Sequence, residues 1–167
     1  MVAGGAISYR PADASRDLDI VAAIEAKSYP DDEAASRESI AKRMAEAPEF
    51  FMVMEREGCG IVGFINGTTS SASNLTHESM SKHEPDGTLL CIHSVVVDQA
   101  HRGQGLARAM LAFYCQKFLP TGRGLKETRL ICKAHLRGFY GALFEMVGPS
   151  PVVHGADPWF EMKRNLA

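Results

Sequence analysis

The 167-residue sequence lacks an excess of charge of either sign and lacks a long hydrophobic run. Lys and Arg (18) nearly balance Asp and Glu (20), which gives a formal net charge of −2. A protein that binds the nucleic-acid backbone needs a basic stripe, so this balance argues against nucleic acid as a partner. The longest unbroken apolar stretch, residues 109–115, is far shorter than the roughly 20 residues of a membrane-spanning helix. We therefore expect neither a nucleic-acid nor a membrane partner.

Cysteine is scarce and its spacing forms no motif. The sequence contains no Cys-x-x-Cys pair among Cys59, Cys91, Cys115 and Cys132. This spacing predicts neither a zinc site nor a redox dithiol, and we expect no metal cofactor. Residues 1–10 lack a charged stretch followed by an apolar one, so no signal peptide is expected. A reducing, cytoplasmic compartment is the default prediction.

The remaining composition is that of one soluble domain. With 46% apolar residues, a chain of this length can bury a sizeable core, and we expect a single domain over residues 1–167. Apolar periodicity predicts strands at residues 7–9, 50–55, 61–68, 89–97 and 128–132, with one or two more within 144–164. It predicts helices ending near Ser28 and at Ala47, and helices over 105–118 and 137–143. Residues 57–60 read as a hairpin turn, and 69–87 as a long loop with one short helical turn.

This order of elements predicts a mixed α/β (α+β) fold. Its central sheet would be mixed but mainly antiparallel, with about seven strands and about four flanking helices.

The most informative stretch joins a strand to a helix through two glycines. Val95-Val96-Val97 is followed, after four residues, by Arg102-Gly103-Gln104-Gly105-Leu106-Ala107 and then an apolar helix. At a helix N-terminus unpaired N–H groups and the helix dipole attract an anion, and glycine lets it approach the backbone. The turn can therefore hold a pyrophosphate, although the two glycines can equally serve a tight turn alone. Dinucleotide binding is disfavoured because Arg108 stands where a third glycine would be needed.

Arg102-x-x-Gly105-x-Ala107 resembles the R/Q-x-x-G-x-G/A signature of the GNAT superfamily of acetyl-CoA-dependent N-acetyltransferases. Further segments resemble, in the same order, the arylalkylamine (serotonin) N-acetyltransferase family, especially its non-vertebrate members. They are SYPDDEAAS (28–36), LTHESM (75–80), IHSVVV (92–97), FY (139–140) and GPS (148–150). The resemblance covers roughly residues 20–165 and implies the GNAT fold, with acetyl-CoA as co-substrate.

Acyl transfer to an amine requires that the amine lose a proton, since an alkylammonium has a pKa of about 10.4. His93 is the candidate base, on the strand that leads to the glycine turn; the alternative is a packed strand histidine. The vertebrate family members carry two histidines, one residue apart, where this chain has Cys91 and His93. Cys91 shares a strand face with His93 and can lie near the proton path. A nucleophilic role for Cys91 is less favoured than that of a small buried side chain.

Tyr140 is the candidate acid that protonates the departing thiolate, because the family uses a tyrosine of a Phe-Tyr pair in this way. The alternative is an aromatic core residue, which Phe139 is expected to be. Most relatives read Phe-Tyr-x-x-x-Gly-Phe, whereas residues 139–144 here lack that glycine.

The resemblance also assigns the cofactor-binding residues. It implies a bulge that aims the backbone amides of Val95, Val96 and Val97 at the thioester and pantetheine. The candidate phosphate-binding residues are Arg102, Gly103, Gln104, Gly105, Leu106, Ala107 and Arg108. Arg102 is interpreted as a phosphate contact, with a solvated loop arginine as the alternative.

The resemblance implies that an aromatic amine is enclosed by two loops and the C-terminal tail. The candidate substrate-binding residues are Tyr29, Pro30, Met80 and Trp159, since apolar and aromatic walls suit such a ligand. Acidic residues 31–33 are expected to stay solvated at a helix start. The other five histidines, namely His77, His83, His101, His135 and His154, lack metal-ligand spacing and are interpreted as loop residues.

The sequence thus predicts a cytoplasmic enzyme, a monomer or homodimer, that acetylates a small primary amine by direct transfer in a ternary complex. The arylalkylamines are the expected substrates. The alternatives are a polyamine, a protein N-terminus, or a non-catalytic domain that binds CoA.

Overall fold

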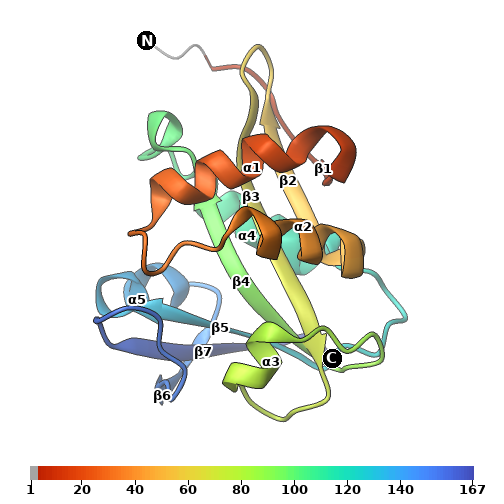
Figure 1. Ribbon diagram of the computed structural model, residues 1–167, viewed down its shortest axis with the longest axis vertical. Coiled ribbons are helices and arrows are strands. Elements are labelled where there is room, and N and C mark those ends of the chain that lie inside the picture. The colour runs from red at the N-terminus through yellow and green to blue at the C-terminus, as the bar shows by residue number, and fades with distance from the viewer. Residues whose placement is uncertain (1–3) are drawn as a thin grey trace. The chain divides into compact units, whose positions relative to one another are not determined.

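The computed structural model describes residues 4–167 and shows a seven-stranded sheet with five α-helices (Figure 1). The strands are β1 (Ile7–Pro11), β2 (Phe51–Arg56), β3 (Gly60–Ser70), β4 (Leu89–Val97), β5 (Glu127–Lys133), β6 (Glu145–Pro149) and β7 (Trp159–Asn165). The α-helices are α1 (Ala14–Ser28), α2 (Arg37–Glu46), α3 (His77–Ser81), α4 (Leu106–Phe113) and α5 (Arg137–Tyr140). Expectations for Met1 to Ala3, which are part of the signal-peptide prediction, lie outside the described residues.

Hydrogen bonding orders the strands β1-β2-β3-β4-β5-β7-β6. The pairs β1–β2, β2–β3, β5–β7 and β6–β7 are antiparallel, and β4–β5 is parallel. The prediction of a mixed, mainly antiparallel sheet is therefore confirmed. The helix beyond the four expected is α3, which forms within the long loop that was predicted to hold one helical turn.

The packing divides the chain into two compact units, which are described separately. The first consists of residues up to Asn66 together with Ser94–Leu119, and the second of Gly67–His93 and Pro120–Ala167. The prediction of one acetyltransferase domain over the whole chain stays a prediction.

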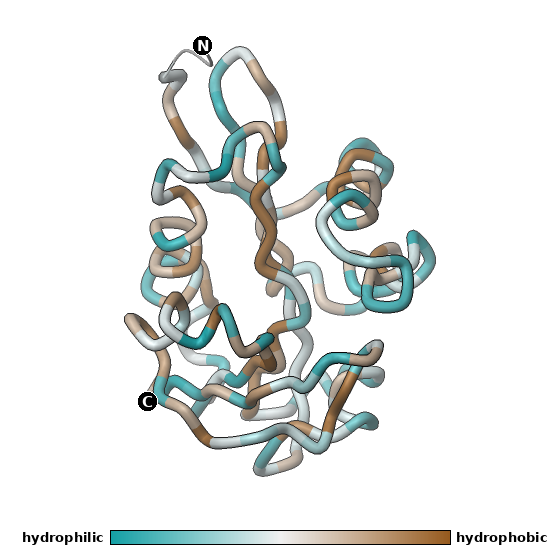
Figure 2. Tube along the Cα trace, turned by 90° about the vertical axis from the view of Figure 1, so that its left-hand side faces the viewer, coloured by the Kyte–Doolittle hydropathy of each residue, from teal (hydrophilic) through white to brown (hydrophobic). Residues whose placement is uncertain are grey.

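In the first unit, alternate side chains of β2 point to opposite faces of the sheet. Phe51 and Val53 join a hydrophobic cluster with Val21 and Ile24 of α1 and with residues of α2. Met54 points the other way, because a Cβ added at its partner Gly63 would meet both Met54 and Met110 of α4. This period of two explains why α1 and α2 cover one face of these strands and α4 the other (Figure 1). In the hydropathy trace of Figure 2, continuous hydrophobic stretches run along the central strands, whereas hydrophobic and hydrophilic residues alternate along the helices.

The helix ends of the first unit follow from capping residues. Asp13 accepts a hydrogen bond from the Ser15 amide at the start of α1, and Ser36 accepts one from Ser39 at the start of α2. Such caps satisfy backbone N–H groups that have no partner within the helix. The predicted ends of both helices, before Pro30 and Pro48, are confirmed within a residue or two.

The helix predicted over 105–118 differs in detail. Gly105 is its N-cap, and the α-helical part ends at Phe113 and continues as a π-helix over Tyr114–Phe118. Tyr114 is fully buried and donates a hydrogen bond to the Phe50 carbonyl at 2.7 Å. This bond fixes a bulky ring at the point where the helical hydrogen-bond pattern widens.

The second unit has its own hydrophobic cluster and contains a strand, β7, that is hydrogen-bonded along both edges. Leu75, Leu89, Cys91 and Val152 are buried together, with Met80 packed against them. In β7 the adjacent residues Glu161 and Met162 are both buried. β7 lies between β5 and β6 and so is paired along both edges.

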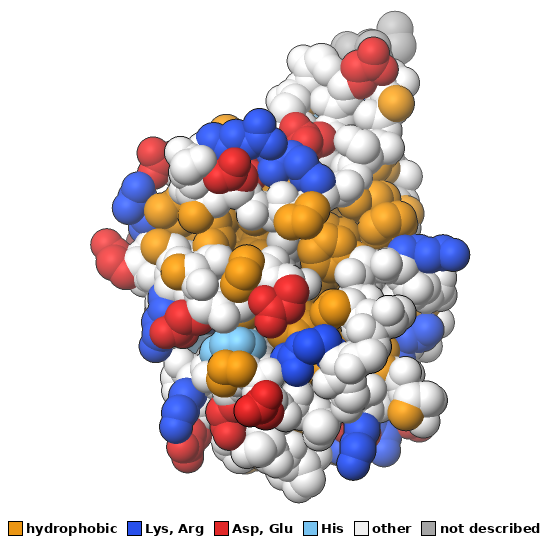
Figure 3. All heavy atoms as spheres, turned by 90° about the vertical axis from the view of Figure 1, so that its right-hand side faces the viewer, with side chains coloured by type: hydrophobic (Ala, Val, Ile, Leu, Met, Phe, Trp, Pro, Cys, Tyr) orange, Lys and Arg blue, Asp and Glu red, His pale blue; other side chains and the backbone are white. Residues whose placement is uncertain are grey.

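Charged side chains of both signs are mixed on the one face that Figure 3 shows. On the face shown in Figure 3, basic and acidic side chains are interspersed among apolar ones. Within residues 4–167, no helix is long and apolar enough to cross a membrane.

Candidate anion-binding turn and acid–base residues

The strand–turn–helix predicted from the two glycines is present in the first unit. β4 ends at Val97, a short 3₁₀ turn covers Gln99–His101, and α4 begins at Leu106. Gly103 and Gly105 both have φ of 77°, in the left-handed region that glycine adopts at little cost. No side chain of the described residues caps the start of α4. The turn 102–106, hereafter the anion-binding turn, therefore presents helix N-terminal amides without a side-chain acceptor, as an anion requires.

Arg102 is exposed, but its guanidinium donates hydrogen bonds to two other residues of the first unit. Its Nε donates to the Val97 carbonyl at 2.8 Å, and a terminal nitrogen donates to the Ser28 hydroxyl at 3.1 Å. The side chain therefore braces the turn against the end of β4 and the end of α1. Its expected phosphate contact stays a prediction.

The sequence analysis missed a second arginine at this turn. Arg56, the last residue of β2, donates to Nδ1 of His101 at 2.9 Å and to Oε1 of Gln104 at 2.9 Å. His101, interpreted above as a loop histidine, is instead buried and part of this contact. An arginine at the end of an apolar strand is too common for the sequence to have revealed this role.

Tyr29, a candidate substrate residue, contacts the strand that was expected to bind the thioester. The Tyr29 hydroxyl lies near the backbone amide of Val95. Burial is the main cause that raises the pKa of this phenol, and the Glu25 carboxylate adds to the rise. The Tyr29 hydroxyl is therefore neutral and lies beside β4, whereas the neighbouring Pro30 is exposed.

Beside Tyr29 lies a buried carboxyl that the sequence analysis did not single out. Glu25 accepts a hydrogen bond of 2.6 Å from the Ser94 hydroxyl, and burial raises its pKa. The charge of Arg43 opposes that rise. Glu25 lies on the buried stripe of α1, one turn before its end, so helical periodicity brings it to β4.

In the second unit, His93 has a fixed partner. Its Nε2 lies 2.7 Å from the hydroxyl oxygen of Thr68 on β3. Either the hydroxyl donates to Nε2 or the Nε2 hydrogen is donated to the hydroxyl, so Thr68 orients the ring in both cases. The parallel pairing of β4 with β5, as described for residues 4–167, covers Leu89–Cys91 and ends before His93.

Cys91 is buried in the hydrophobic cluster of the second unit. Burial raises the pKa of its thiol to about 12, although a hydrogen bond with Ser79 opposes the rise. A thiol that stays protonated is a poor nucleophile, which favours the interpretation of Cys91 as a small buried side chain.

Tyr140 is the last residue of α5 and is 7% exposed. Its ring contacts Phe139 and Phe144 edge to face, at centroid distances of 4.9 and 6.3 Å. The amide of Phe144 donates to the Tyr140 carbonyl at 2.7 Å. The family's glycine is missing after α5, but no residue there needs the left-handed conformation that favours glycine. Within the described residues, positive φ occurs only at glycines.

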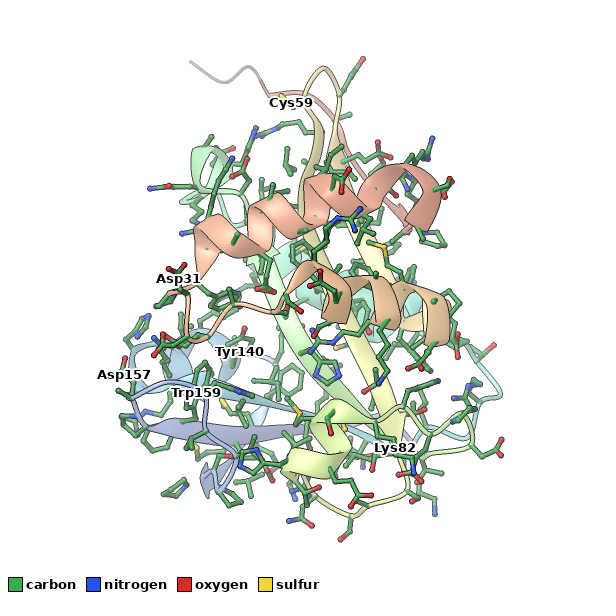
Figure 4. All side chains as sticks on the ribbon, in the orientation of Figure 1. Asp31, Cys59, Lys82, Tyr140, Asp157 and Trp159 are labelled. Atoms are coloured by element: carbon green, nitrogen blue, oxygen red, sulfur yellow. The ribbon has the colours of Figure 1, made fainter. Side chains whose placement is uncertain are left out.

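The remaining candidate substrate residues belong to different elements of the second unit. Met80 of α3 packs against the cluster that contains Cys91. Trp159 begins β7 and donates from Nε1 to the His154 carbonyl at 2.7 Å (Figure 4). Asp31 lies in the segment after α1 and is exposed, as expected of a solvated carboxylate (Figure 4). Among residues 4–167, no group of three His, Cys, Asp or Glu side chains could hold a metal ion.

Curated relatives share part of the sequence. Serotonin N-acetyltransferase from Mesocricetus auratus is 30% identical over 120 residues, and the protein of that name from Homo sapiens is 29% identical. Each match covers 71% of this chain, and the chain spans 57% of the length of those relatives.

Solved structures share the fold over nearly the whole chain. The loading GNATL domain of CurA from Lyngbya majuscula has a TM-score of 0.83 at 15% identity, covering 96% of this chain and 98% of that chain. Diaminobutyrate acetyltransferase EctA from Paenibacillus lautus, solved with L-2,4-diaminobutyric acid and coenzyme A, has a TM-score of 0.69 at 21% identity, covering 98% of each chain. The GNAT-like decarboxylase GphF, solved with isobutyryl-CoA, has a TM-score of 0.77 at 20% identity, covering 96% of this chain and 100% of its own.

The sequence model of the acetyltransferase (GNAT) family matches residues 18–142, a stretch that contains β2–β5, the anion-binding turn and both His93 and Tyr140. The predicted superfamily is confirmed: this chain belongs to the acetyltransferase (GNAT) family.

Proposed function

We propose that this protein transfers the acetyl group of acetyl-CoA to the primary amine of a small arylalkylamine, by direct attack in a ternary complex. The observation that carries the proposal is the anion-binding turn. Its two left-handed glycines and uncapped helix start suit the pyrophosphate of a CoA thioester. Relatives of this fold have been solved with CoA and with isobutyryl-CoA.

The residues fit such a cofactor along the strand and the turn. The backbone of residues 102–108 would hold the pyrophosphate, with Arg102 near it. Amides of Val95 to Val97 would bind pantetheine and the acetyl carbonyl.

The chemical step needs one base and one acid. His93 would accept a proton from the ammonium form of the substrate, which frees the nitrogen lone pair to attack the thioester carbon. A C–N bond forms, the C–S bond breaks, and Tyr140 would give its proton to the leaving thiolate. The second proton that the attacking nitrogen loses on becoming the amide would restore the Tyr140 phenol. Thr68 would orient the His93 ring throughout, as its hydrogen bond indicates.

The preference for an aromatic amine is supported by two observations. The sequence matches serotonin N-acetyltransferases over 120 residues. The candidate substrate residues also include two half-buried aromatic side chains, Tyr29 and Trp159, whose faces suit an aromatic ligand.

The direct experiment measures CoA thiol release from acetyl-CoA with tryptamine, serotonin, phenylethylamine, spermidine and a short peptide. We expect release with the three arylalkylamines. Release with spermidine or peptide alone would keep acetyl transfer and overturn the substrate class. If no amine of the panel causes CoA release while acetyl-CoA still raises the Tm, the result would favour a domain that binds CoA without catalysis.

A glycine pair tests the turn in the same assay. Gly105→Ala places a Cβ at φ of 77°, where nothing lies within 4 Å, so the cost is backbone strain of roughly 1–2 kcal/mol rather than a clash. Gly58, in the β2–β3 hairpin, has φ of 82° and equally open space, which makes Gly58→Ala the matched control. Both variants should lose similar stability, but only Gly105→Ala should raise the KM for acetyl-CoA. Equal KM values would contradict a phosphate site at the turn.

A further inference from the structure

Arg56 is a buried cation that has no acidic hydrogen-bond partner among residues 4–167. It is 6% exposed, and its hydrogen bonds within the described residues go to three neutral acceptors. These are the Gly5 carbonyl at 3.5 Å, His101 Nδ1 at 2.9 Å and Gln104 Oε1 at 2.9 Å. Guanidinium stays charged at any physiological pH, so its positive charge is permanent.

Arg10 shows how an arginine of the same unit is normally compensated. It donates to Asp17 at 2.7 Å and to Glu55 at 2.6 Å, and the hydrogen bond with Asp17 is the main reason its pKa is raised. Taking a cation out of water is costly unless an anion or good acceptors replace the solvent. Arg56 has acceptors but no anion, and the charge that remains lies beside the anion-binding turn.

The contacts of Arg56 also fix the conformation of that turn. Guanidinium has donors only, so Nδ1 of His101 must accept and its hydrogen is on Nε2. Gln104 lies between the two left-handed glycines and is otherwise exposed. The planar guanidinium of Arg56 therefore fixes the positions of His101 and Gln104, which lie three residues apart just before α4.

We propose that Arg56 is the positioning residue of the anion-binding turn, and that its uncompensated charge strengthens the binding of the phosphates of CoA. This inference rests on the proposed function, because it takes the CoA thioester as the ligand. It adds a residue from β2, more than 40 positions away in the sequence, to a turn that is otherwise built from one continuous segment.

The test compares acetyl-CoA with S-acetylpantetheine, which lacks the phosphates. Arg56→Gln should raise the KM for acetyl-CoA by about 10- to 100-fold, the range for losing charge-assisted hydrogen bonds, while kcat changes little. The kcat/KM for S-acetylpantetheine should stay as in the wild type. Arg56→Lys, which keeps the charge but loses the planar guanidinium, should recover part of the affinity for acetyl-CoA.

Two further variants separate this role from general destabilisation. Arg10→Gln removes a paired arginine from the same unit and should lower the Tm without changing the ratio of kcat/KM for the two donors. Gln104→Ala cuts one tether from an exposed position, so it should fold and should raise the KM for acetyl-CoA by a smaller factor. If Arg56→Gln weakens both donors equally, or neither, the inference is wrong.

Calorimetric binding of CoA keeps the inference distinct from the proposed catalysis. A wild type that binds CoA but acetylates no amine overturns the proposed activity, and the loss of CoA affinity in Arg56→Gln still supports the inference. A wild type that does not bind CoA overturns both.

Discussion

The anion-binding turn of the first unit and the acid–base residues of the second unit differ in the charge of their side chains. Around the turn the charge is permanent, since Arg56 and Arg102 are guanidinium groups bonded to neutral acceptors. The candidate residues of the second unit carry side chains that can be neutral. The thiol of Cys91 is protonated, and Tyr140 is held by two aromatic rings.

This difference matches two separate tasks. Binding an anionic cofactor requires fixed donors whose charge never changes, because every change would alter affinity. Moving a proton requires groups that can exist in two protonation states near the working pH. Substitutions at the turn should therefore change the affinity for acetyl-CoA, and substitutions at the acid–base residues should change turnover or its pH dependence.

The largest effect is expected for Tyr140→Phe. Losing the proton donor for the thiolate should lower kcat by about 100- to 1000-fold, with little change in the KM for acetyl-CoA. Tyr114→Phe is the matched control, because it also removes a buried hydroxyl, here bonded to the Phe50 carbonyl. That control should cost about 1 kcal/mol of stability and leave kcat unchanged. Unchanged turnover in Tyr140→Phe would remove this residue from the mechanism.

A smaller effect, with a pH signature, is expected for His93→Gln. We expect kcat/KM for the amine to fall by about 10- to 100-fold, and the acidic limb of the pH profile to lose the ionisation of the base. His83→Gln is the control, since His83 accepts a hydrogen bond from the Thr69 amide at the end of β3. Steady-state rates from pH 5.5 to 9 would measure both, and a profile that keeps its acidic limb would argue against His93 as the base.

The smallest effect is expected for Cys91→Ala. With a pKa of about 12, the Cys91 thiol stays protonated and its charge changes only in strong alkali. Turnover should therefore change by less than about threefold, with an unaltered pH profile. Cys132→Ala offers a comparison, because burial also raises the pKa of that thiol, to about 11. A loss of tenfold or more confined to Cys91→Ala would show that this residue takes part in the reaction.

Elements with strong local signals were predicted well. Ser36 and Pro48 mark the two ends of α2, and the glycine spacing marks the turn before α4. The extent of α5 was overestimated, since the helix stops at Tyr140 and continues as a turn closed by the Phe144 amide. The change to π-helix at Tyr114 was also missed, because Tyr114 is fixed by a bond to Phe50, 64 residues away.

The contacts that define the candidate site were the least predictable. Thr68, Glu25 and Arg56 bear no local pattern that distinguishes them from other strand and helix residues. Each gains its role from a partner far along the chain, respectively His93, Ser94 and His101.

The sequence by itself determined the order of the elements, the glycine turn before an apolar helix, and the family, because these depend on neighbouring residues and on spacing. Only the tertiary structure decided which side chains are buried together and in which protonation state. A single hydrogen bond, such as that of 2.9 Å between Arg56 and Gln104, depends on the end of β2 meeting a turn 48 residues further along the chain. Periodicity predicts which face a residue occupies, but the partner on that face comes from another part of the chain.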